Sequence, residues 1–295
     1  MMASRGLDMF QMTRISASVV LYSTPQWQLA RLIDCLRHST LPVRLYIVDN
    51  SPHPIQLPSL DGIDAICLRP ARNGGYGSGH NLALRQSVNT VDFHFVINPD
   101  IAFGRDELGK MVRFIEGDTT IGLVMPRVIY PDGRLQRLCK LLPSPLDLFL
   151  RRFPLGVLSS ITEQRKKRFE LGNWEYDRIL DVPYLSGCFM LLRTSALREV
   201  GLFDERFFMY MEDVDLSRRI HRQFRTVYFP EATVIHDHAQ ESYKSLRAFR
   251  IHNRSAVQYF NKWGWIWDPE RRKLNREALS RIDQLARDCS SSSRI

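Results

Sequence analysis

Three carboxylates stand close together in residues 207–220, "FFMYMEDVDLSRRI", directly after a run of bulky apolar residues. Acids in the first turn of a helix are stabilised by the helix dipole, so capping accounts for one or two of Glu212, Asp213 and Asp215. Capping explains less well why two adjacent acids follow "RFFMYM". A carboxylate against apolar surface has a raised pKa and can act as a general base. The stretch therefore indicates either a capped helix or the chemical centre of an enzyme.

Further polar residues follow predicted strands. Asn98 and Asp100 belong to "NPD", and Asp49 lies in "VDNSP". A carboxylate beside a diphosphate often holds Mg²⁺ or Mn²⁺ through oxygen, whereas the alternative for both motifs is an ordinary turn with a capping aspartate. His236 and His238 occupy alternate positions of an extended segment, so we expect both side chains on one side. Such a pair is a better candidate for a metal or phosphate site than a single histidine.

A glycine-rich stretch, "RNGGYGSGHN" at 72–81, opens a predicted helix. Glycines let the backbone approach a ligand closely, and a helix N-terminus offers N–H groups to phosphate. No Gly-Lys-Ser/Thr follows, so the stretch is not a P-loop, and it does not follow the first strand as a dinucleotide-binding motif would. Phosphate binding and an ordinary loop both stay open at this point.

Strands and helices alternate through the first half of the chain. Short apolar runs predict strands at 15–22, 43–50, 63–70, 93–100 and 121–130, with helices at 26–39, 78–88 and 106–117. This alternation implies a mainly parallel sheet with right-handed crossovers, which binds ligands beyond the carboxyl ends of its strands. The polar residues expected at those ends are Tyr22, Asp49, Asn50, Asn98 and Asp100.

The alternation stops at residue 131. Residues 131–178 mix apolar pairs with basic residues and predict an insertion rather than a core element. Beyond it we expect a strand at 182–193, a short helix at 194–201, one or two short strands at 226–238 and a helix at 245–263. The predicted organisation is one domain over 1–267, with the insertion at 130–180, and a polar tail over 268–295 that frays.

Composition narrows the class of protein. The apolar fraction of 44% fits a packed globular chain, and the net charge of +9 favours nucleic acid, a phosphorylated ligand or an acidic membrane surface as partner. No stretch is long and apolar enough to span a bilayer, and the first residues lack the apolar core of a signal peptide, so we expect a cytoplasmic protein. The five cysteines are scattered without a CxxC pair, which predicts reduced thiols.

The motifs are more informative in their order than singly. "VVLYS", "VDNSP", "NGGYGSGHN", "NPD", "YLSGCFMLLR", "FDERFFMYMEDVDLSRRI" and "IHDHAQES" followed by "YFNKWGW" occur in this sequence. Together they resemble the inverting nucleotide-sugar glycosyltransferases of family 2, and in particular the bacterial rhamnosyltransferase branch that builds O-antigen and other surface polysaccharides. The resemblance covers residues 16–267 and implies an α/β, Rossmann-like GT-A domain around a central mixed, mainly parallel sheet, followed by C-terminal helices.

The resemblance also implies roles for single residues. It places Tyr22 and Asp49 in the nucleotide pocket, Arg72, Asn73, Gly75 and Asn81 along the diphosphate and ribose, and Ser186, Gly187 and Cys188 beside the donor sugar and acceptor. Asp213 is the expected base, with Glu212 as neighbour or substitute. Asn98 and Asp100 occupy the family's DxD position, where Asp100 contacts the Mg²⁺ or Mn²⁺ ion and His236 completes the metal or diphosphate shell.

Two departures from the family's pattern bear on the chemistry. Asn98 replaces the usual first aspartate, which weakens metal binding and puts strict metal dependence in doubt, and Ser23 replaces a frequent asparagine. The expected donor is dTDP-L-rhamnose and the expected acceptor is a polyprenyl-diphosphate-linked saccharide, in one displacement that inverts the anomeric centre. The alternatives are transfer of another hexose from a UDP- or GDP-sugar, a nucleotidyltransferase, and a nucleic-acid-binding protein; we expect no nucleic acid partner.

The basic excess gathers near apolar residues in two segments. Residues 138–168 combine leucines and phenylalanines with "RKKR", and residues 245–267 form a basic and apolar helix. We expect these segments to dock on the anionic inner face of the cell membrane, because each lysine or arginine near such a surface adds about 1 kcal/mol. The alternative is that the apolar residues pack on the domain and the basic cluster is a solvated face.

Overall fold

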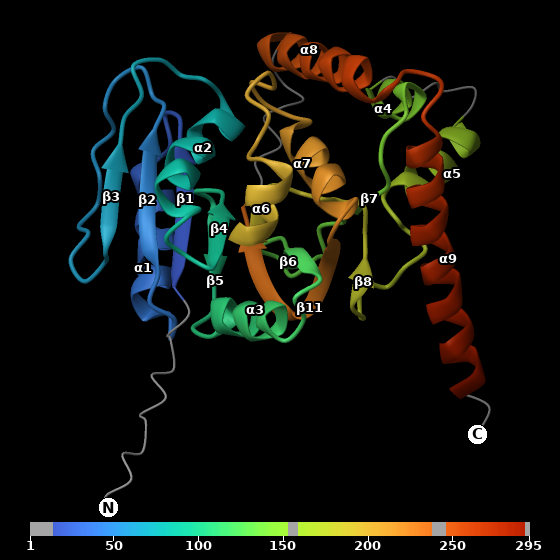
Figure 1. Cartoon of the computed structure of the whole chain (residues 1–295), viewed down its shortest axis with the longest axis horizontal. Helices are drawn as coiled ribbons and strands as arrows, with labels where there is room; N and C mark the ends of the chain where they lie inside the picture. Colours follow the sequence, from blue (N-terminus) through green and yellow to red (C-terminus); the bar gives the residue numbers. More distant parts are fainter. Residues whose placement is uncertain (1–13, 153–158, 238–245, 293–295) are drawn as a thin grey trace, which may run out of the picture.

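The structure, a computed structural model, describes residues 14–152, 159–237 and 246–292 of the chain. A nine-stranded sheet in the order β3-β2-β1-β4-β10-β6-β11-β5, with β8 beside β11, carries helices on both faces (Figure 1). Its strands are β1 (Ile15–Leu21), β2 (Arg44–Asp49), β3 (Ala65–Leu68), β4 (Phe93–Ile97), β5 (Ile101–Phe103), β6 (Ile121–Ile129), β8 (Leu180–Asp181), β10 (Phe189–Arg193) and β11 (Arg225–His236). A separate antiparallel pair joins β7 (Cys139–Lys140) to β9 (Tyr184–Leu185).

The sheet consists of a parallel half and a mixed half. β1 lies between β2 and β4 in parallel register, so that Val19 is level with both Ile47 and Ile97. β10 then runs antiparallel to β4 and β6, whereas β11 runs parallel to β6. The predicted α/β fold with a central mixed sheet is confirmed.

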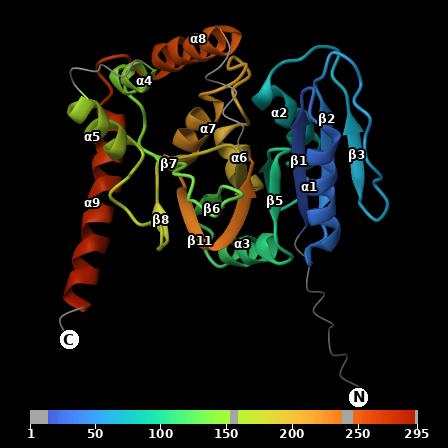
Figure 2. The ribbon, with the colours of Figure 1, turned by 180° about the vertical axis from the view of Figure 1, so that it is seen from behind.

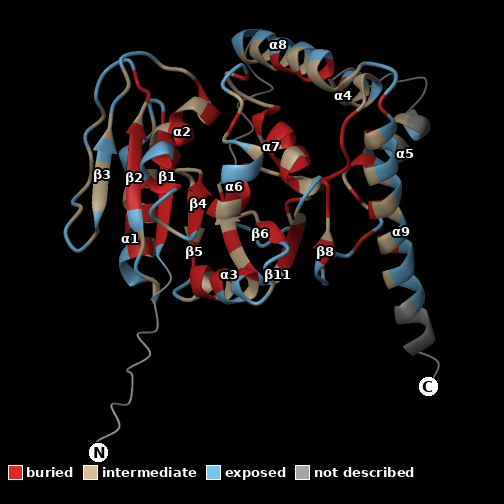
Figure 3. Ribbon diagram, viewed as in Figure 1, coloured by how far each residue is buried: buried red, intermediate tan, exposed pale blue. Residues whose placement is uncertain are grey.

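Two apolar layers hold the helices to the sheet. One layer lies under α1 (Gln26–His38) and α3 (Glu107–Glu116), where α1 contributes Leu29, Leu32, Ile33 and Leu36 at helical spacing. The opposite layer lies under α2 (Tyr76–Ser87), α6 (Thr194–Val200) and α7 (Glu212–His221). In the reverse view of Figure 2, α1 lies in front of the sheet. Figure 3 shows that the central strands are buried.

The strand predicted at 93–100 ends earlier than expected, and a turn follows it. β4 ends at Ile97, residues 98–100 form a turn, and β5 begins at Ile101. Conversely, the one or two short strands expected at 226–238 are one long strand, β11, with an irregularity between Phe229 and Thr233. β11 reaches β5 with His236 opposite Ile101, which carries this histidine to the "NPD" turn.

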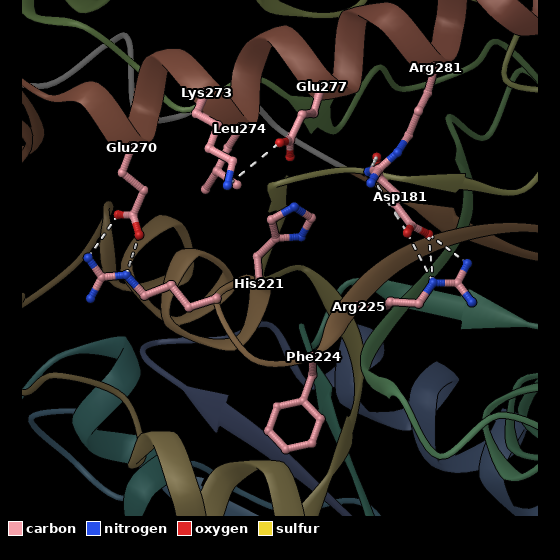
Figure 4. A pocket seen from close by; sticks show the side chains of 10 residues that line it. Asp181, His221, Phe224, Arg225, Glu270, Lys273, Leu274, Glu277 and Arg281 are labelled. Carbon is pink, nitrogen blue, oxygen red and sulfur yellow. Dashed lines mark hydrogen bonds and ion pairs between the residues drawn. The ribbon is translucent and has the colours of Figure 1, made fainter.

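The prediction of a frayed tail after residue 267 is wrong, because Pro269–Ser292 form helix α9. Ala278 and Ile282, one turn apart, are buried in the same layer as α7. The helix has few apolar side chains among many charged ones, so the sequence shows no clear helical periodicity. Around a hollow of about 310 Å³, α9 also makes polar contacts: Glu270 pairs with Arg222, and Arg281 donates to the Asp181 carbonyl (Figure 4).

Part of the predicted insertion belongs to the core, so its description as a peripheral element is wrong there. Leu141, Trp174 and Tyr176 are buried in the layer that also holds α7, and the Trp174 and Tyr176 rings stack with centroids 4.2 Å apart. α4 (Pro145–Arg152) lies outside this layer, whereas α5 (Ser159–Phe169) reaches it through its last residue, Phe169. Leu148 of α4 packs on Tyr259 and Phe260 of α8 (Leu246–Trp263), which places α4 beside α8.

The thiols of Cys35, Cys67, Cys139 and Cys188 are free, as predicted for reduced cysteines. Within the described ranges, we find no helix with the length and apolar character that a bilayer crossing requires.

Candidate active site

A cavity of about 570 Å³ opens at the carboxyl ends of β1 and β2. Its lining comes from the ends of these strands, from the glycine-rich loop and from α8: Tyr22, Asp49, Asn50, Ser51, Pro52, Arg69, Pro70, Ala71, Arg72, Asn73, Phe208 and Arg247. Four of the predicted donor-site residues, Tyr22, Asp49, Arg72 and Asn73, therefore lie together. The volume falls in the range of pockets that hold small ligands and cofactors.

Asp49 is fixed and charged at the floor of this cavity. Its carboxylate accepts hydrogen bonds from the amides of Ser51 (2.9 Å) and Ile55 (3.2 Å) and pairs with Arg69 at 2.5 Å. Burial opposes ionisation, but the bonds from Ser51 and Ile55 and the charge of Arg69 outweigh it and hold the pKa of Asp49 below its usual value. The carboxylate is thus an acceptor that a donor group on a ligand can approach.

The glycine-rich loop is held against the loop that precedes α7. Gly75 has φ +95°, and a Cβ there would lie 1.8 Å from the carbonyl oxygen of Phe208. That carbonyl accepts a 2.8 Å hydrogen bond from the Tyr76 amide, the first residue of α2. Only glycine fits, because the position needs both a left-handed conformation and a close backbone contact. Gly75 therefore shapes the cavity rim.

Asn81 lies apart from the cavity, unlike Arg72 and Asn73, which line it. It is buried, and its side chain donates to the Phe203 carbonyl and to Glu205 while accepting the Phe203 amide. All of these contacts hold the chain between α6 and α7. The structure thus gives Asn81 a positioning contact with that loop rather than a place beside a ligand.

Asp100 and His236 meet at the "NPD" turn. His236 Nε2 lies 3.4 Å from Asp100 Oδ1 and 3.5 Å from the Asn98 amide nitrogen. Gln136 donates its amide to the carbonyls of His236 (2.7 Å) and Ile129 (3.4 Å), so its Oε1 faces His236 Nδ1 at 2.9 Å. Nδ1 therefore donates to Gln136, and Nε2 is the ring nitrogen that faces Asp100. His238, the predicted partner of His236, lies outside the described residues.

Tyr76 connects this corner to the acidic stretch. Its hydroxyl lies 3.0 Å from the Asn98 side-chain oxygen and 2.6 Å from the Gly187 carbonyl. The Gly187 amide in turn donates to Asp213 Oδ2 at 3.0 Å. Burial, followed by the charges around it, raises the pKa of Tyr76 well above its usual value, so the phenol keeps its proton. A continuous chain of contacts therefore runs from the "NPD" turn to Asp213.

The adjacent acids Glu212 and Asp213 occupy different surroundings. Asp213 is half-buried and also faces the Tyr184 hydroxyl at 3.4 Å. Burial raises its pKa, while the Gly187 amide and then the Val214 amide oppose that rise. Glu212 is buried, and its Oε2 has no hydrogen-bond partner in the described parts of the chain. Burial and then the charge of Asp213 raise the pKa of Glu212 well above its usual value, which favours its neutral form.

The third acid of the opening stretch is structural. Asp215 is fully buried and accepts from Arg219 at 2.8 Å, from Lys262 at 2.6 Å and from the Trp263 indole at 2.8 Å. These contacts tie α7 to α8. The opening stretch therefore starts a helix, in which Asp215 has a structural role and Asp213 is the candidate for chemistry.

Ser186, Gly187 and Cys188 lie between the two acidic centres. A Cβ on Gly187 would lie 3.1 Å from Asp213 Cβ and 3.5 Å from the Tyr76 ring, so glycine lets these groups converge. Burial, partly offset by a hydrogen bond with Ser186, raises the pKa of Cys188 to about 12. The thiol stays protonated, so it is a poor nucleophile.

Sequence reasoning missed several residues of the site. Lys140 is buried on β7 opposite Tyr184 of β9, its Nζ lies 5.8 Å from the Tyr184 ring centroid, and its charge lowers the pKa of Asp213. The others are Tyr76, Arg69, Gln136, Tyr184 and Arg247. Tyr76 lay within the quoted glycine-rich motif, which was its only signal; Lys140 belonged to the segment described as an insertion.

Comparison with known proteins shows which of them share the fold and the sequence of this chain. No protein-family model matches the chain. Solved structures with the same fold are S. aureus TarS (TM-score 0.55, 14% identity, 91% of this chain and 43% of that one) and the mannosyltransferase PcManGT from Pyrobaculum calidifontis with GDP-Man and Mn²⁺ (TM-score 0.52, 14% identity, 96% and 81%). The chain thus spans 43% of the length of TarS.

The fold is that of solved glycosyltransferases such as PcManGT, and the relatives of the chain in sequence are glycosyltransferases. In sequence it is similar to the N-acetylglucosaminyl-diphospho-decaprenol L-rhamnosyltransferase of Mycobacterium tuberculosis, with 29% identity over 251 residues and 78% of each chain covered. It is also similar to the rhamnosyltransferase WbbL of Escherichia coli K12, with 28% identity over 199 residues, 63% of this chain and 70% of that one. The predicted resemblance to family 2 rhamnosyltransferases is confirmed.

Proposed function

We propose that the protein transfers an L-rhamnosyl group from dTDP-L-rhamnose to a polyprenyl-diphosphate-linked saccharide during cell-surface polysaccharide synthesis. The observation that carries this proposal is the half-buried Asp213 carboxylate, linked through Gly187 and Tyr76 to the corner of Asp100 and His236. A base and a corner that can hold a cation, on opposite sides of one residue, suit a displacement at a sugar carbon between them. The names of the relatives supply the sugar and the lipid carrier.

The donor would occupy the cavity at the ends of β1 and β2. The half-exposed Tyr22 ring offers a surface for base stacking, and Asp49 offers an acceptor to the base edge. Arg72 and the N-terminus of α2 would face the diphosphate. The sugar would then project toward Gly187 and Asp213.

Asp213 would accept the proton of the acceptor hydroxyl as that oxygen attacks the anomeric carbon. The Gly187 and Val214 amides hold its carboxylate in place, at 3.0 and 2.8 Å. The leaving diphosphate departs from the opposite face, so one displacement inverts the anomeric centre. The protonated Cys188 does not support a covalent intermediate, which agrees with this single step.

A divalent cation fits the corner as a partial site. Within the described ranges no group of three or more His, Cys, Asp and Glu side chains gathers as a metal site, but Asp100 and His236 Nε2 supply two donors. The Asn98 side chain can supply a third donor atom. The single hydroxyl proton of Tyr76 goes to the Gly187 carbonyl, so Tyr76 does not require the Asn98 oxygen as its acceptor. Rotating the Asn98 amide by half a turn would then direct its nitrogen at Tyr76 and its oxygen at His236. When bound, Mg²⁺ or Mn²⁺ would supply positive charge to the leaving diphosphate.

We further place the protein at the inner face of the cell membrane, where a polyprenyl carrier keeps its acceptor. The relevant test is transfer from a panel of dTDP-, UDP- and GDP-sugars to a short-chain polyprenyl-diphosphate-GlcNAc. We expect dTDP-L-rhamnose to be the preferred donor and the product to have the inverted anomeric configuration. Preference for a UDP- or GDP-hexose would replace the sugar assignment, and nucleotidyl transfer or a retained configuration would overturn the mechanism.

A further inference from the structure

We infer that one face of the molecule docks on an anionic lipid bilayer and brings the donor cavity to the membrane surface. The docking face consists of the outer side of α8, the turn at 264–267 and the exposed side of α4. Its apolar members are Leu146, Phe149, Leu246, Val257, Trp265, Ile266 and Trp267, and its basic members are Arg250 and Arg254. This inference deepens the proposed function and rests on it for the lipid-linked acceptor.

The apolar part is concentrated in the turn after α8. Ile266 is 82% exposed and Trp267 is 74% exposed, although both are large apolar residues that normally lose water on folding. Adjacent exposed apolar side chains of this size mark an interaction surface. A tryptophan ring also suits the boundary between lipid headgroups and acyl chains, since it is apolar with one polar N–H.

The turn is held in shape from both sides. Trp265 packs on Phe260, with ring centroids 5.2 Å apart, and its indole donates to Asn261 at 2.8 Å. On the other side Asp268 is buried and pairs with Arg218 at 2.7 Å. Ile266 and Trp267 therefore project from a fixed support, and little conformational freedom is lost when they enter another phase.

The charge of α8 identifies what covers the face. The helix sequence, LRAFRIHNRSAVQYFNKW, contains arginines and a lysine but no acidic residue. Leu246, Arg250, Arg254 and Val257 follow one another at spacings of four, four and three, so they share one side of the helix and all are exposed. Basic residues interleaved with apolar ones are complementary to a surface with anionic headgroups over hydrocarbon.

The position of the face connects it to catalysis. Arg247, in the first turn of α8, lines the donor cavity. α8, α4 and the turn before α9 lie along the same side of the molecule in both ribbon views, and the outer side of α8 is exposed (Figures 1, 2 and 3). A bilayer on this face would lie beside the cavity mouth, where a lipid-linked hydroxyl must arrive.

The structure thus changes which residues should bind the membrane. Of the apolar residues expected to dock from 138–168, Leu141, Leu142 and Leu148 are buried, and among those that the structure describes only Leu146 and Phe149 are exposed. The "RKKR" cluster lies on α5, which is separate from the α8 stripe. The face at 246–267 becomes the main contact.

Vesicle co-sedimentation of the full chain tests the inference. Wild-type protein should bind vesicles containing phosphatidylglycerol, bind phosphatidylcholine vesicles at least tenfold more weakly, and dissociate as salt is raised. Ile266→Ser with Trp267→Ser should weaken binding at least tenfold. Arg250→Ser with Arg254→Ser should weaken it about 25-fold, since each arginine near an anionic surface contributes about fivefold. A matched pair, Arg105→Ser with Arg113→Ser, removes the same charge near α3 on the opposite side and should bind like wild type.

Two further readouts separate this inference from the proposed function. Vesicle binding is measured without nucleotide sugar, so a wrong donor assignment leaves it intact. Thermal unfolding and transfer to a water-soluble acceptor should be unchanged in the docking-face variants, while transfer to a long-chain acceptor in vesicles falls with binding.

Equal binding by all variants, an equal loss in the α3 control, or binding independent of anionic lipid would overturn the inference. Salt-sensitive binding of duplex nucleic acid, or a dimer abolished by the Ile266 and Trp267 changes, would assign the face to that partner instead.

Discussion

At the scale of single residues, two neighbouring carboxylates are given different states by their surroundings. Glu212 is buried, one of its oxygens has no hydrogen-bond partner among the described residues, and burial and the charge of Asp213 raise its pKa well above the usual value. Asp213 is half-buried and receives the Gly187 amide. A carboxyl that keeps its own proton cannot accept the acceptor's proton. We therefore propose Asp213 as the base, a choice that the sequence left open.

Replacing Asp213 tests this assignment directly. Asp213→Asn keeps the shape of the side chain but removes its ability to accept a proton, and we expect kcat to fall by about 10²–10⁴. Donor affinity, measured by calorimetry, should stay within about twofold. Glu212→Gln is the matched control and should keep most of the activity, because it replaces one neutral group by another. A dead Glu212→Gln beside an active Asp213→Asn would exchange the roles.

Lys140 opposes the rise in the pKa of Asp213, so we expect it to extend the range of Asp213 as a base to lower pH. The positive charge of Lys140 favours the ionised form of Asp213. The other titratable groups that face Asp213 are Glu212, Tyr184 and Cys188. Lys140→Met should raise the pKa of Asp213 further. Since the base must be ionised, the acidic limb of kcat/KM should move to higher pH, with activity recovered in alkaline buffer. Lys140→Arg should keep the wild-type profile, and a pH-independent loss in Lys140→Met would reduce Lys140 to a packing role.

At the scale of elements, local pattern and long-range pairing contribute differently to what can be predicted. β1, β2 and β4 are short, mostly apolar and buried runs, so their position and the acids at their ends follow from the sequence. The meeting of His236 with Asp100 depends on the register of β11 against β5, and no local pattern encodes that pairing. The same reason hid Lys140, whose place depends on the pairing of β7 with β9.

Helix α9 escaped prediction because its anchor is polar. Arg218 of α7 is 1% exposed and is held by Asp268 and Glu270 at 2.7 and 2.6 Å, with its guanidinium 4.1 Å from the centroid of the Trp263 ring. Burial opposes ionisation of Asp268, but Arg218 outweighs it and holds the pKa of Asp268 below its usual value. The pair therefore contributes stability above the unfolded pKa of about 3.9 and loses it as pH falls through the lower folded value.

Breaking this anchor should destabilise the whole chain. Asp268→Asn leaves the buried Arg218 with only the partly exposed Glu270, so we expect the free energy of unfolding to fall by about 3 kcal/mol. Chemical denaturation at neutral pH measures this change, and the acid-induced loss of stability should shrink in the variant. Glu277→Gln makes the same chemical change in the exposed pair with Lys273 and should cost less than about 0.5 kcal/mol. Equal effects of the two changes would argue against the anchor.

At the scale of the whole molecule, the site lies where the parallel half of the sheet meets the mixed half. The donor cavity belongs to the ends of β1 and β2, whereas His236 comes from β11 and Asp213 from α7. β10 joins the two halves, and Gly187 and Cys188 directly precede it. A ligand that touches both halves should therefore stabilise them as one unit.

Ligand protection measures this coupling without turnover. Free dTDP at about 100 times its Kd should stabilise the protein by about 2.7 kcal/mol, seen as a rise in Tm. Adding Mn²⁺ should raise Tm further only when dTDP is present, because Asp100 and His236 form an incomplete site that diphosphate oxygens complete. Asp100→Ala should remove the Mn²⁺-dependent increment and keep most of the dTDP effect, since Tyr22, Asp49 and Arg72 line the cavity and Asp100 does not. Asp106→Ala, which removes an exposed carboxylate beside Arg113, is the control and should keep both increments. An Mn²⁺ increment that persists in Asp100→Ala would exclude this corner as the cation site, and a Tm unaffected by dTDP would exclude the cavity as the donor site.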